Sequence, residues 1–346
     1  PENNTWTNNT EVHLAPQFIN QTSGNGSTWQ ATNNYPTAYS SHYELPGAYM
    51  SLLVGDAIYF SADDGSTGIE LWAFSITNQT AWLVADINSG SGSSVPGNDM
   101  SLLVGDTLYF GADDGTNGRE LWVSDGTPIG TIMLGDMESG DAIDWTSEIT
   151  SWMNGAVFTT HGPQGHRMWW TNGSVTTSIW QAPWFSSTVS SDLVNQSTAL
   201  SSLGQGLLQG DEYGLWFAAK DAQAGLEMMF LSIDGTLHLY DLQPFGDSSP
   251  SQGLSIEDGF IIAAGDGTGR QLAKLDRDGG YQWLTSMTKE GTTTPISVMA
   301  PAFGIQQLGD ILVFDVVYRG ADATLFGYSL TTDTLQELSN SIKRFK

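Results

Sequence analysis

The sequence predicts an all-β protein, a single six-bladed β-propeller of four-stranded antiparallel blades, with seven blades as the alternative. Residues 50–72 (MSLLVGDAIYFSADDGSTGIELW) and 100–122 (MSLLVGDTLYFGADDGTNGRELW) are identical at 17 of 23 positions, and weaker copies continue along the chain. No helical periodicity of useful length interrupts them. A repeat of about 50 residues with four short strands has the size of a propeller blade, whereas a β-solenoid has much shorter coils.

Six copies align on one apolar residue of the second strand. The anchors are Phe60, Phe110, Phe158, Phe217, Ile262 and Phe314, with spacings of 50, 48, 59, 45 and 52 residues. The propeller is therefore predicted over residues 47–340, after an extended Asn/Thr-rich arm over 1–46 and before a basic tail over 341–346. Because the last copy holds four strands of its own, we expect the ring to close without the arm.

The second copy shows the expected order of elements most clearly. Its strands are predicted at 101–104, 107–112, 120–124 and 131–134. Gly105-Asp106 separates the first two strands, Asp114-Gly115 begins the next connection, and Asp125-Gly126 makes the third. Asp-Gly between β-rich runs is a strong hairpin signal, since glycine accepts the positive φ of a tight turn. The pattern indicates an antiparallel meander.

These residues also carry a resemblance. The segment ELWVSDGT at 120–127 is similar to the signature of the ELWxxDGT repeat proteins, and Asp86-Ile87 followed by Ser93-Ser94 resembles the segment that ends such a repeat. Asp241-Leu242 followed by Ser248-Ser249 repeats that segment. The resemblance is close in the first two repeats and excludes residues 1–46. It implies a secreted or surface-exposed β-propeller whose repeats are structural, and it implies no reaction.

Composition excludes several classes of function. The chain has 346 residues, with 11 Lys+Arg against 38 Asp+Glu and a net charge of −27. No Lys or Arg precedes Arg119, so we expect no nucleic-acid partner and no docking on anionic lipid. No apolar run reaches the ~18 residues of a transmembrane segment. Cysteine is absent, which removes disulfides, thiolate catalysis and Cys-ligated zinc.

The N-terminus and the glycosylation signals suggest an extracellular or cell-surface glycoprotein. The chain starts at Pro1 without an initiator Met, as expected of a secreted protein whose signal peptide has been removed. Seven Asn-x-Ser/Thr sequons occur, where roughly three or four would arise by chance: Asn3, Asn8, Asn20, Asn25, Asn78, Asn172 and Asn195. The alternative is a polar, Asn/Thr-rich surface without glycans.

One acidic cluster recurs at the same place in the first two repeats. Its members are Asp63, Asp64, Glu70, Asp113, Asp114 and Glu120. Carboxylates near a turn with free carbonyls suit calcium, so a Ca²⁺ site is one interpretation. The alternative is a turn in which each Asp bonds its own backbone, while each Glu reaches a neighbouring blade.

Other chemical signals are weaker. His161 and His166 could be half of a metal site, but a polar hairpin tip explains them more simply. Trp72, Trp122 and Trp169 recur at one blade position, which indicates core residues before sugar platforms. No nucleophile elbow, P-loop or dinucleotide fingerprint is present, so the sequence names no catalytic residue and no cofactor besides possible calcium.

Three functions remain open: a non-catalytic structural protein that assembles with copies of itself, a glycan- or calcium-binding surface propeller, and a polysaccharide-acting enzyme. The arm favours the first, as a filament or lattice held by arm-to-neighbour contacts. It carries apolar residues that could dock on a neighbouring blade edge: Trp6, Val12, Leu14, Phe18, Ile19 and Trp29. Outer strands present unpaired backbone groups, so strand addition is the expected mode. A head-to-tail contact of this kind gives an open filament unless its rotation closes a ring.

Overall fold

The computed structural model describes residues 17–22, 27–32, 47, 49–138, 140–143, 147–162, 165–179, 207–221, 224–244, 246–286, 305–317 and 323–342. These residues form strands and turns. They include no helix that is long and apolar enough to cross a membrane.

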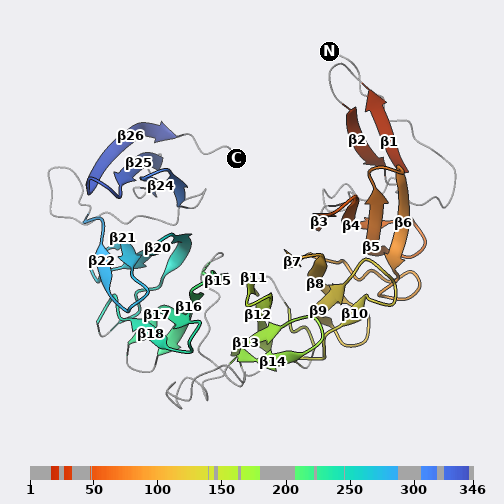
Figure 1. The fold of residues 1–346 in the computed structure, drawn as a ribbon, viewed down its shortest axis with the longest axis horizontal. Coiled ribbons are helices and arrows are strands. Elements are labelled where there is room, and N and C mark those ends of the chain that lie inside the picture. The colour runs from red at the N-terminus through yellow and green to blue at the C-terminus, as the bar shows by residue number, and fades with distance from the viewer. Residues whose placement is uncertain are drawn as a thin grey trace. The chain divides into compact units, whose positions relative to one another are not determined.

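Six four-stranded antiparallel sheets follow one another along the chain (Figure 1). Sheet 1 holds β3 (Ser51–Val54), β4 (Ala57–Asp63), β5 (Ile69–Ser75) and β6 (Thr80–Ala85). Sheet 2 holds β7 (Ser101–Val104), β8 (Thr107–Asp113), β9 (Arg119–Ser124) and β10 (Ile132–Met133). Sheet 3 holds β11 (Ile149–Trp152), β12 (Gly155–Gly162), β13 (Gly165–Thr171) and β14 (Thr176–Ser178).

The second half of the chain repeats this plan. Sheet 4 holds β15 (Gln209–Gly210), β16 (Gly214–Asp221), β17 (Gly225–Ser232) and β18 (Leu237–Tyr240). Sheet 5 holds β19 (Ser251–Ile256), β20 (Gly259–Gly265), β21 (Arg270–Leu275) and β22 (Tyr281–Trp283). Sheet 6 holds β23 (Gln306–Leu308), β24 (Ile311–Val317), β25 (Ala323–Ser329) and β26 (Thr334–Ile342).

Every sheet is a meander of four consecutive strands, which confirms the predicted fold class, six four-stranded antiparallel sheets consistent with a six-bladed propeller. Each is built from its own repeat, and among the described residues none takes a strand from the N-terminal arm. In sheet 2 the predicted strands are correct to within two residues at each end. The last strand runs to Ile342, so 341–342 belong to β26 and not to the tail.

The turn chemistry explains the register. Gly55 and Gly105 join the first two strands of sheets 1 and 2 with φ of 58° and 60°, a conformation that other residues rarely adopt. The two-residue turns place Phe60 opposite Ser51 and Phe110 opposite Ser101. In the next strand pair of each sheet, Phe60 lies opposite Trp72 and Phe110 opposite Trp122. The anchor residue and the ELW tryptophan are therefore cross-strand partners.

The structure divides into two compact units. The first is Pro1–Ile149, Asn154–Pro163 and Trp169–Thr177, and the second is Thr150–Met153, Gln164–Met168 and Ser178–Lys346. In the first unit Phe110 of β8 packs in a core with Leu71 of sheet 1, while its neighbour Tyr109 packs with Phe158 of sheet 3. Side chains alternate between the two faces of a strand, so one sheet supplies two cores.

The second unit uses the same arrangement. Phe260 of β20 stacks on Trp216 of sheet 4, with ring centroids 5.0 Å apart, while the adjacent Ile261 packs with Phe314 of sheet 6. Trp216 and Phe260 are fully buried. Burying such a side chain contributes about 1.5–3 kcal/mol to folding, so the packing of one sheet on the next is the main source of stability.

The arm contains a hairpin that the sequence analysis did not predict. Strand β1 (Gln17–Thr22) pairs with β2 (Ser27–Thr32) in a separate two-stranded sheet, and β1 contacts β6 without joining its sheet. Phe18, Ile19 and Trp29 lie on these strands. The other predicted arm anchors, Trp6, Val12 and Leu14, lie outside the described residues.

Candidate functional site

One polar position recurs in the interior of the sheets, at the start of the third strand. Glu70, Glu120 and Glu227 are each fully buried. Each lies opposite an alanine of the second strand, and Gln271 takes the same place in sheet 5. A buried carboxylate needs hydrogen bonds to offset its desolvation, so its partners reveal what it does.

Glu70 holds the segment that connects sheet 1 to sheet 2. Its carboxylate accepts hydrogen bonds from the backbone N–H groups of Ile87 (2.8 Å), Asn88 (3.3 Å) and Ser94 (3.0 Å), and from the Ser94 hydroxyl (2.6 Å). Burial raises the pKa of Glu70 to about 7, although these hydrogen bonds act in the opposite direction. The Glu of the ELW motif is thus a clamp between consecutive repeats.

Sheets 4 and 5 carry equivalent clamps. Glu227 accepts hydrogen bonds from the N–H groups of Leu242 (3.1 Å) and Ser248 (2.8 Å), and burial raises its pKa. Gln271 accepts one from the Thr285 hydroxyl at 2.9 Å. A neutral amide therefore serves in sheet 5 where other sheets use a carboxyl group.

The clamp of sheet 2 is incomplete. The N–H of Met137 donates to Glu120 Oε2 at 3.2 Å, but Oε1 has no hydrogen-bond partner among the described residues. Ala142 occupies the position of Ser94, since its N–H donates to the Arg119 carbonyl just as that of Ser94 donates to the Ile69 carbonyl. The missing hydroxyl leaves the acceptor unpaired.

The pKa of Glu120 reflects its burial and its acidic neighbours. Burial, and after it the negative charges of Asp136 and Glu138, raise the pKa of Glu120 to about 8, against the effects of the Met137 and Glu138 N–H groups. Glu120 therefore binds a proton more tightly than an ordinary glutamate does. The segment that follows sheet 2 is also two residues shorter than the one that follows sheet 1. Ala142 lies six residues after Asp136, whereas Ser94 lies eight residues after Asp86.

A pocket of about 480 Å³ lies beside this incomplete clamp. It is lined by Thr116, Asn117, Gly118, Asp136, Met137, Glu138 and Gly140. The lining residues include hydroxyl, amide and carboxylate side chains, which suit a small hydrogen-bonding ligand. Sequence reasoning did not find this pocket, because only comparison of two connectors in space shows where one is shorter.

The acidic turns form the Asx-type turns that were the alternative to calcium. Asp64 Oδ1 accepts from the N–H groups of Ser66 (2.8 Å) and Thr67 (2.9 Å), and Asp114 Oδ1 does the same with Thr116 and Asn117, both at 2.8 Å. Burial opposes ionisation at Asp64 and Asp114, but these hydrogen bonds outweigh it and lower both pKa values.

The structure does not bring the six predicted calcium ligands together as a metal centre. Among the residues it describes, no group of three or more His, Asp or Glu side chains could hold a metal ion. Asp63 and Asp113 each accept a hydrogen bond from the glycine N–H two residues later. Glu70 faces the connector instead of the turn. His161 lies exposed at the end of β12.

The remaining predicted residues fall into two groups. Trp72, Trp122 and Trp169 join apolar clusters, which confirms the prediction of core residues. Asn78 and Asn172 are exposed in turns, as glycosylation requires, and Asn20 lies on β1. Asn3, Asn8, Asn25 and Asn195 lie outside the described residues.

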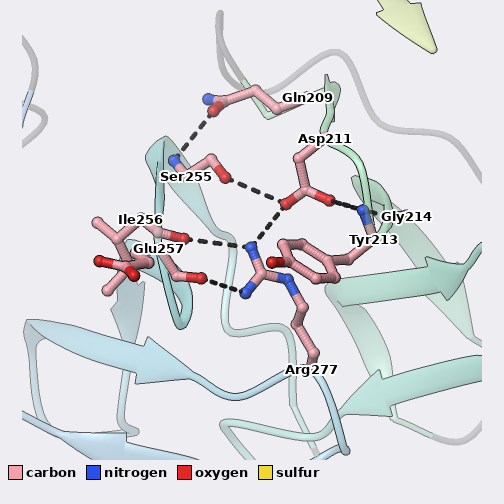
Figure 2. Close-up of polar contacts among 8 residues, drawn as sticks. All are labelled: Gln209, Asp211, Tyr213, Gly214, Ser255, Ile256, Glu257 and Arg277. Atoms are coloured by element: carbon pink, nitrogen blue, oxygen red, sulfur yellow. Dashed lines mark hydrogen bonds and ion pairs between the residues drawn. The ribbon is translucent and has the colours of Figure 1, made fainter.

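A second polar cluster joins sheets 4 and 5, and sequence reasoning missed it. Figure 2 shows the Arg277 guanidinium between the Asp211 carboxylate, at 2.9 Å, and the Glu257 carbonyl, at 2.7 Å. The guanidinium also lies over the Tyr213 ring, 4.2 Å from its centroid. Asp211 in turn accepts hydrogen bonds from the N–H groups of Tyr213 and Gly214 and so fixes its own turn. The cluster ties one sheet to the next.

Fold and sites together define an all-β protein of the propeller class whose repeats are fastened by buried polar clamps. No protein-family model and no curated protein matches the chain. The resemblance to the ELWxxDGT repeats therefore stays a prediction.

Solved structures do match. Oligopeptidase B from Leishmania major has 7% identity and a TM-score of 0.47 over 84% of this chain and 40% of its own. A puromycin-hydrolyzing peptidase of Mycobacterium tuberculosis has 9% identity and a TM-score of 0.47 over 95% and 49%. The β-propeller domain of the Trilobed protease from Pyrococcus furiosus has 11% identity and a TM-score of 0.39 over 85% and 84%.

These likenesses concern the fold alone. The chain spans less than half the length of each of the first two peptidases. Nothing about the activity of those proteins follows for this chain.

Proposed function

We propose that this chain is a non-catalytic, extracellular structural protein of the ELWxxDGT type that assembles with copies of itself through the outer edges of its sheets. One observation supports this proposal above the others. Among the described residues, six of the 13 exposed large apolar side chains lie on the fourth, outermost strand of a sheet, two lie on a first strand and none lies on a second or third strand. The six are Trp82, Ile132, Leu239, Tyr281, Leu335 and Leu338.

The position of these six exposed side chains supports self-assembly more strongly than their number does. Single exposed apolar residues are normal on a protein surface. An outermost strand, however, also presents unpaired N–H and C=O groups, and natural edges are usually protected by charge or proline. Apolar side chains beside free backbone groups favour strand addition, in which the main chain supplies affinity and the side chains supply specificity.

The buried clamps fit the same function. Glu70 and Glu227 accept hydrogen bonds from backbone N–H groups of their own connectors, and Gln271 accepts one from the Thr285 hydroxyl of its connector. Their recurrence from repeat to repeat is what a stiff structural unit needs, whereas a catalytic pair would be specific to one site. The sequons at Asn78 and Asn172 suit an extracellular location.

The proposal is tested on the full chain, purified from a host that glycosylates. Electron microscopy and sedimentation velocity from low to high protein concentration should show filaments or a lattice that grow with concentration. A chain that stays monomeric throughout, at high salt as well as low, would show that it is not an assembly protein.

One observation favours a second candidate, a glycan-binding surface. The pocket beside Glu120 is lined by Asn117, Asp136 and Glu138, whose side chains can hydrogen-bond sugar hydroxyl groups. Titration calorimetry with acidic, neutral and amino-sugar oligosaccharides tests it, with Asn117→Ala as the binding-deficient variant. If no class of oligosaccharide binds, or if N117A binds as well as the unchanged chain, the candidate fails.

A further inference from the structure

We infer that the free edge of β26 accepts strand β2 of a second copy, an inference that rests on the self-assembly proposed above. The joined elements would be the last strand of one copy and the N-terminal hairpin of the next. Figure 1 shows β26 as the outermost strand of sheet 6 and β2 as one of the two strands of the hairpin.

β26 is longer than the outermost strand of any other sheet. It spans nine residues, whereas the other outermost strands have six residues in β6, four in β18, three in β14 and β22, and two in β10. β26 pairs with β25 on one side, and no described strand pairs with the other. Short strands are a natural protection of sheet edges, and β26 lacks it.

β26 also carries little charge. Its sequence TLQELSNSI has one charged residue, Glu337, and no Lys or Pro. All side chains from Thr334 to Ser339 are exposed, and Leu335 and Leu338 are 40% and 47% exposed. Two register shifts lie within the β25–β26 pair. A long and nearly uncharged edge with exposed leucines is a template for a further strand.

Strand β2 has the properties expected of the strand that pairs with β26. β2 has the sequence STWQAT, without charge, and pairs with β1 on one side only. β1 contacts β6 of the same chain. Among the described residues, β1 lies against β6 without pairing with it, and no strand pairs with the second edge of β2, so β2 offers an edge of six residues.

The charges of the two chain ends also favour contact between the arm of one copy and the C-terminal end of another. A chain of net charge −27 repels its copies, so the contact must form where charge is low or complementary. Residues 1–46 contain Glu2, Glu11 and Glu44 and no Lys or Arg. Directly after β26 the sequence reads KRFK, which holds three of the eleven basic residues. The arm and the C-terminal end are therefore complementary, and each copy carries one donor and one acceptor. This is the head-to-tail arrangement of a filament.

Cross-linking tests the inference directly, because the chain has no cysteine. Gln30→Cys places a thiol on β2 and Gln336→Cys places one on β26, and Gln282→Cys on the short outer strand β22 is the matched control. Chains with Q30C and Q336C are mixed in equal amounts and treated with a short bismaleimide. We expect a covalent dimer from Q30C with Q336C and none from Q30C with Q282C.

A blocking variant gives a second readout. Leu335→Lys combined with Leu338→Lys should lower the association constant about tenfold or more, because each lysine would have to be desolvated beside the added strand. Ile129→Lys combined with Ile233→Lys is the control, since both residues are exposed in turns. Circular dichroism and thermal midpoints check that both double variants fold.

The outcomes distinguish the β2–β26 contact from self-assembly in general. Cross-linking at 30–336 together with loss of assembly in L335K/L338K supports the inference. If the chain assembles but the 30–336 dimer is absent, or L335K/L338K assembles as the unchanged chain does, the inference is overturned and self-assembly stands. If the unchanged chain never associates, both are overturned.

Discussion

The Nη2 atom of Arg277 lies 2.9 Å from Oδ2 of Asp211, although 66 residues separate them (Figure 2). Asp211 belongs to the turn between the first two strands of sheet 4, and Arg277 follows the third strand of sheet 5. The guanidinium also donates to the carbonyls of Ile256 and Glu257. One planar side chain therefore holds two turns of sheet 5 against one turn of sheet 4.

Arg277→Lys should lower the free energy of unfolding by about 1–3 kcal/mol, because an ammonium cannot reproduce the forked contacts of a largely buried guanidinium. Chemical denaturation at neutral pH measures the change. Lys274→Ala is the control, since its partner Asp258 is 69% exposed and such surface pairs contribute 0–1 kcal/mol. Equal effects of the two substitutions would show that the Arg277 cluster is not a clamp.

Ala142→Ser should complete the clamp of sheet 2. A serine hydroxyl at this position would donate to the unpaired Oε1 of Glu120, as Ser94 donates to Glu70. We expect the free energy of unfolding to rise by about 1–2 kcal/mol and the pKa of Glu120 to fall. Thermal and chemical unfolding give the first, and the pH dependence of unfolding gives the second.

Ser94→Ala is the matched reverse substitution. It removes the 2.6 Å bond to Glu70 and should destabilise the chain by about 1–3 kcal/mol, with a higher pKa for Glu70. If S94A and A142S shifted stability in the same direction, the comparison of the two clamps would be wrong.

Stability should fall as the pH rises from about 4.5 to about 8. Glu70 and Glu120 have pKa values raised to about 7 and about 8 in the folded chain, so the folded state binds these protons more tightly than the unfolded state does. The stabilisation is fully present below the unfolded pKa and is lost as the pH rises through the folded pKa.

Glu120→Gln should flatten the upper part of this dependence, because the amide does not ionise, and Gln271 shows that the position accepts an amide. Denaturation midpoints at intervals from pH 5 to pH 9 measure the slope. The exposed Glu257→Gln should leave it unchanged. An unaltered slope in E120Q would mean that Glu120 does not titrate in this range.

Association between copies should strengthen with salt. The net charge of −27 produces repulsion that is screened over a Debye length of about 10 Å at 0.1 M salt, while strand addition itself uses uncharged groups. Sedimentation velocity from 10 mM to 500 mM NaCl should show larger species at high salt. Assembly that weakens over this range would show that attraction between the acidic arm and the basic C-terminal end outweighs the overall repulsion between copies.

The repeats made the fold predictable. The pairs Gly55-Asp56 and Gly105-Asp106 define turns locally, and the alternation around Phe110 defines which residues face a neighbouring sheet. Both signals act over a few residues, so they can be read without the rest of the molecule. The hairpin over 17–32 was missed because its Asn- and Thr-rich sequence has no such alternation.

The clamps were only half predictable. The sequence indicated that Glu70 and Glu120 serve either a metal or a neighbouring blade, and it could not choose. The choice depends on whether the side chain points to the turn three residues away or to the connector 17–24 residues on, and only tertiary packing decides that.

The sequence by itself determined the strand order, the turns and the strong negative charge, since these depend on neighbouring residues and on composition. Only the tertiary structure decided that Oε1 of Glu120 lacks a partner among the described residues beside a pocket, that Arg277 meets Asp211, and that no described strand pairs with the second edge of β26. The physical reason is the same in each case. Hydrogen bonding and burial of a group depend on which distant residues fold against it, and identical local motifs such as the two ELW segments acquire different surroundings.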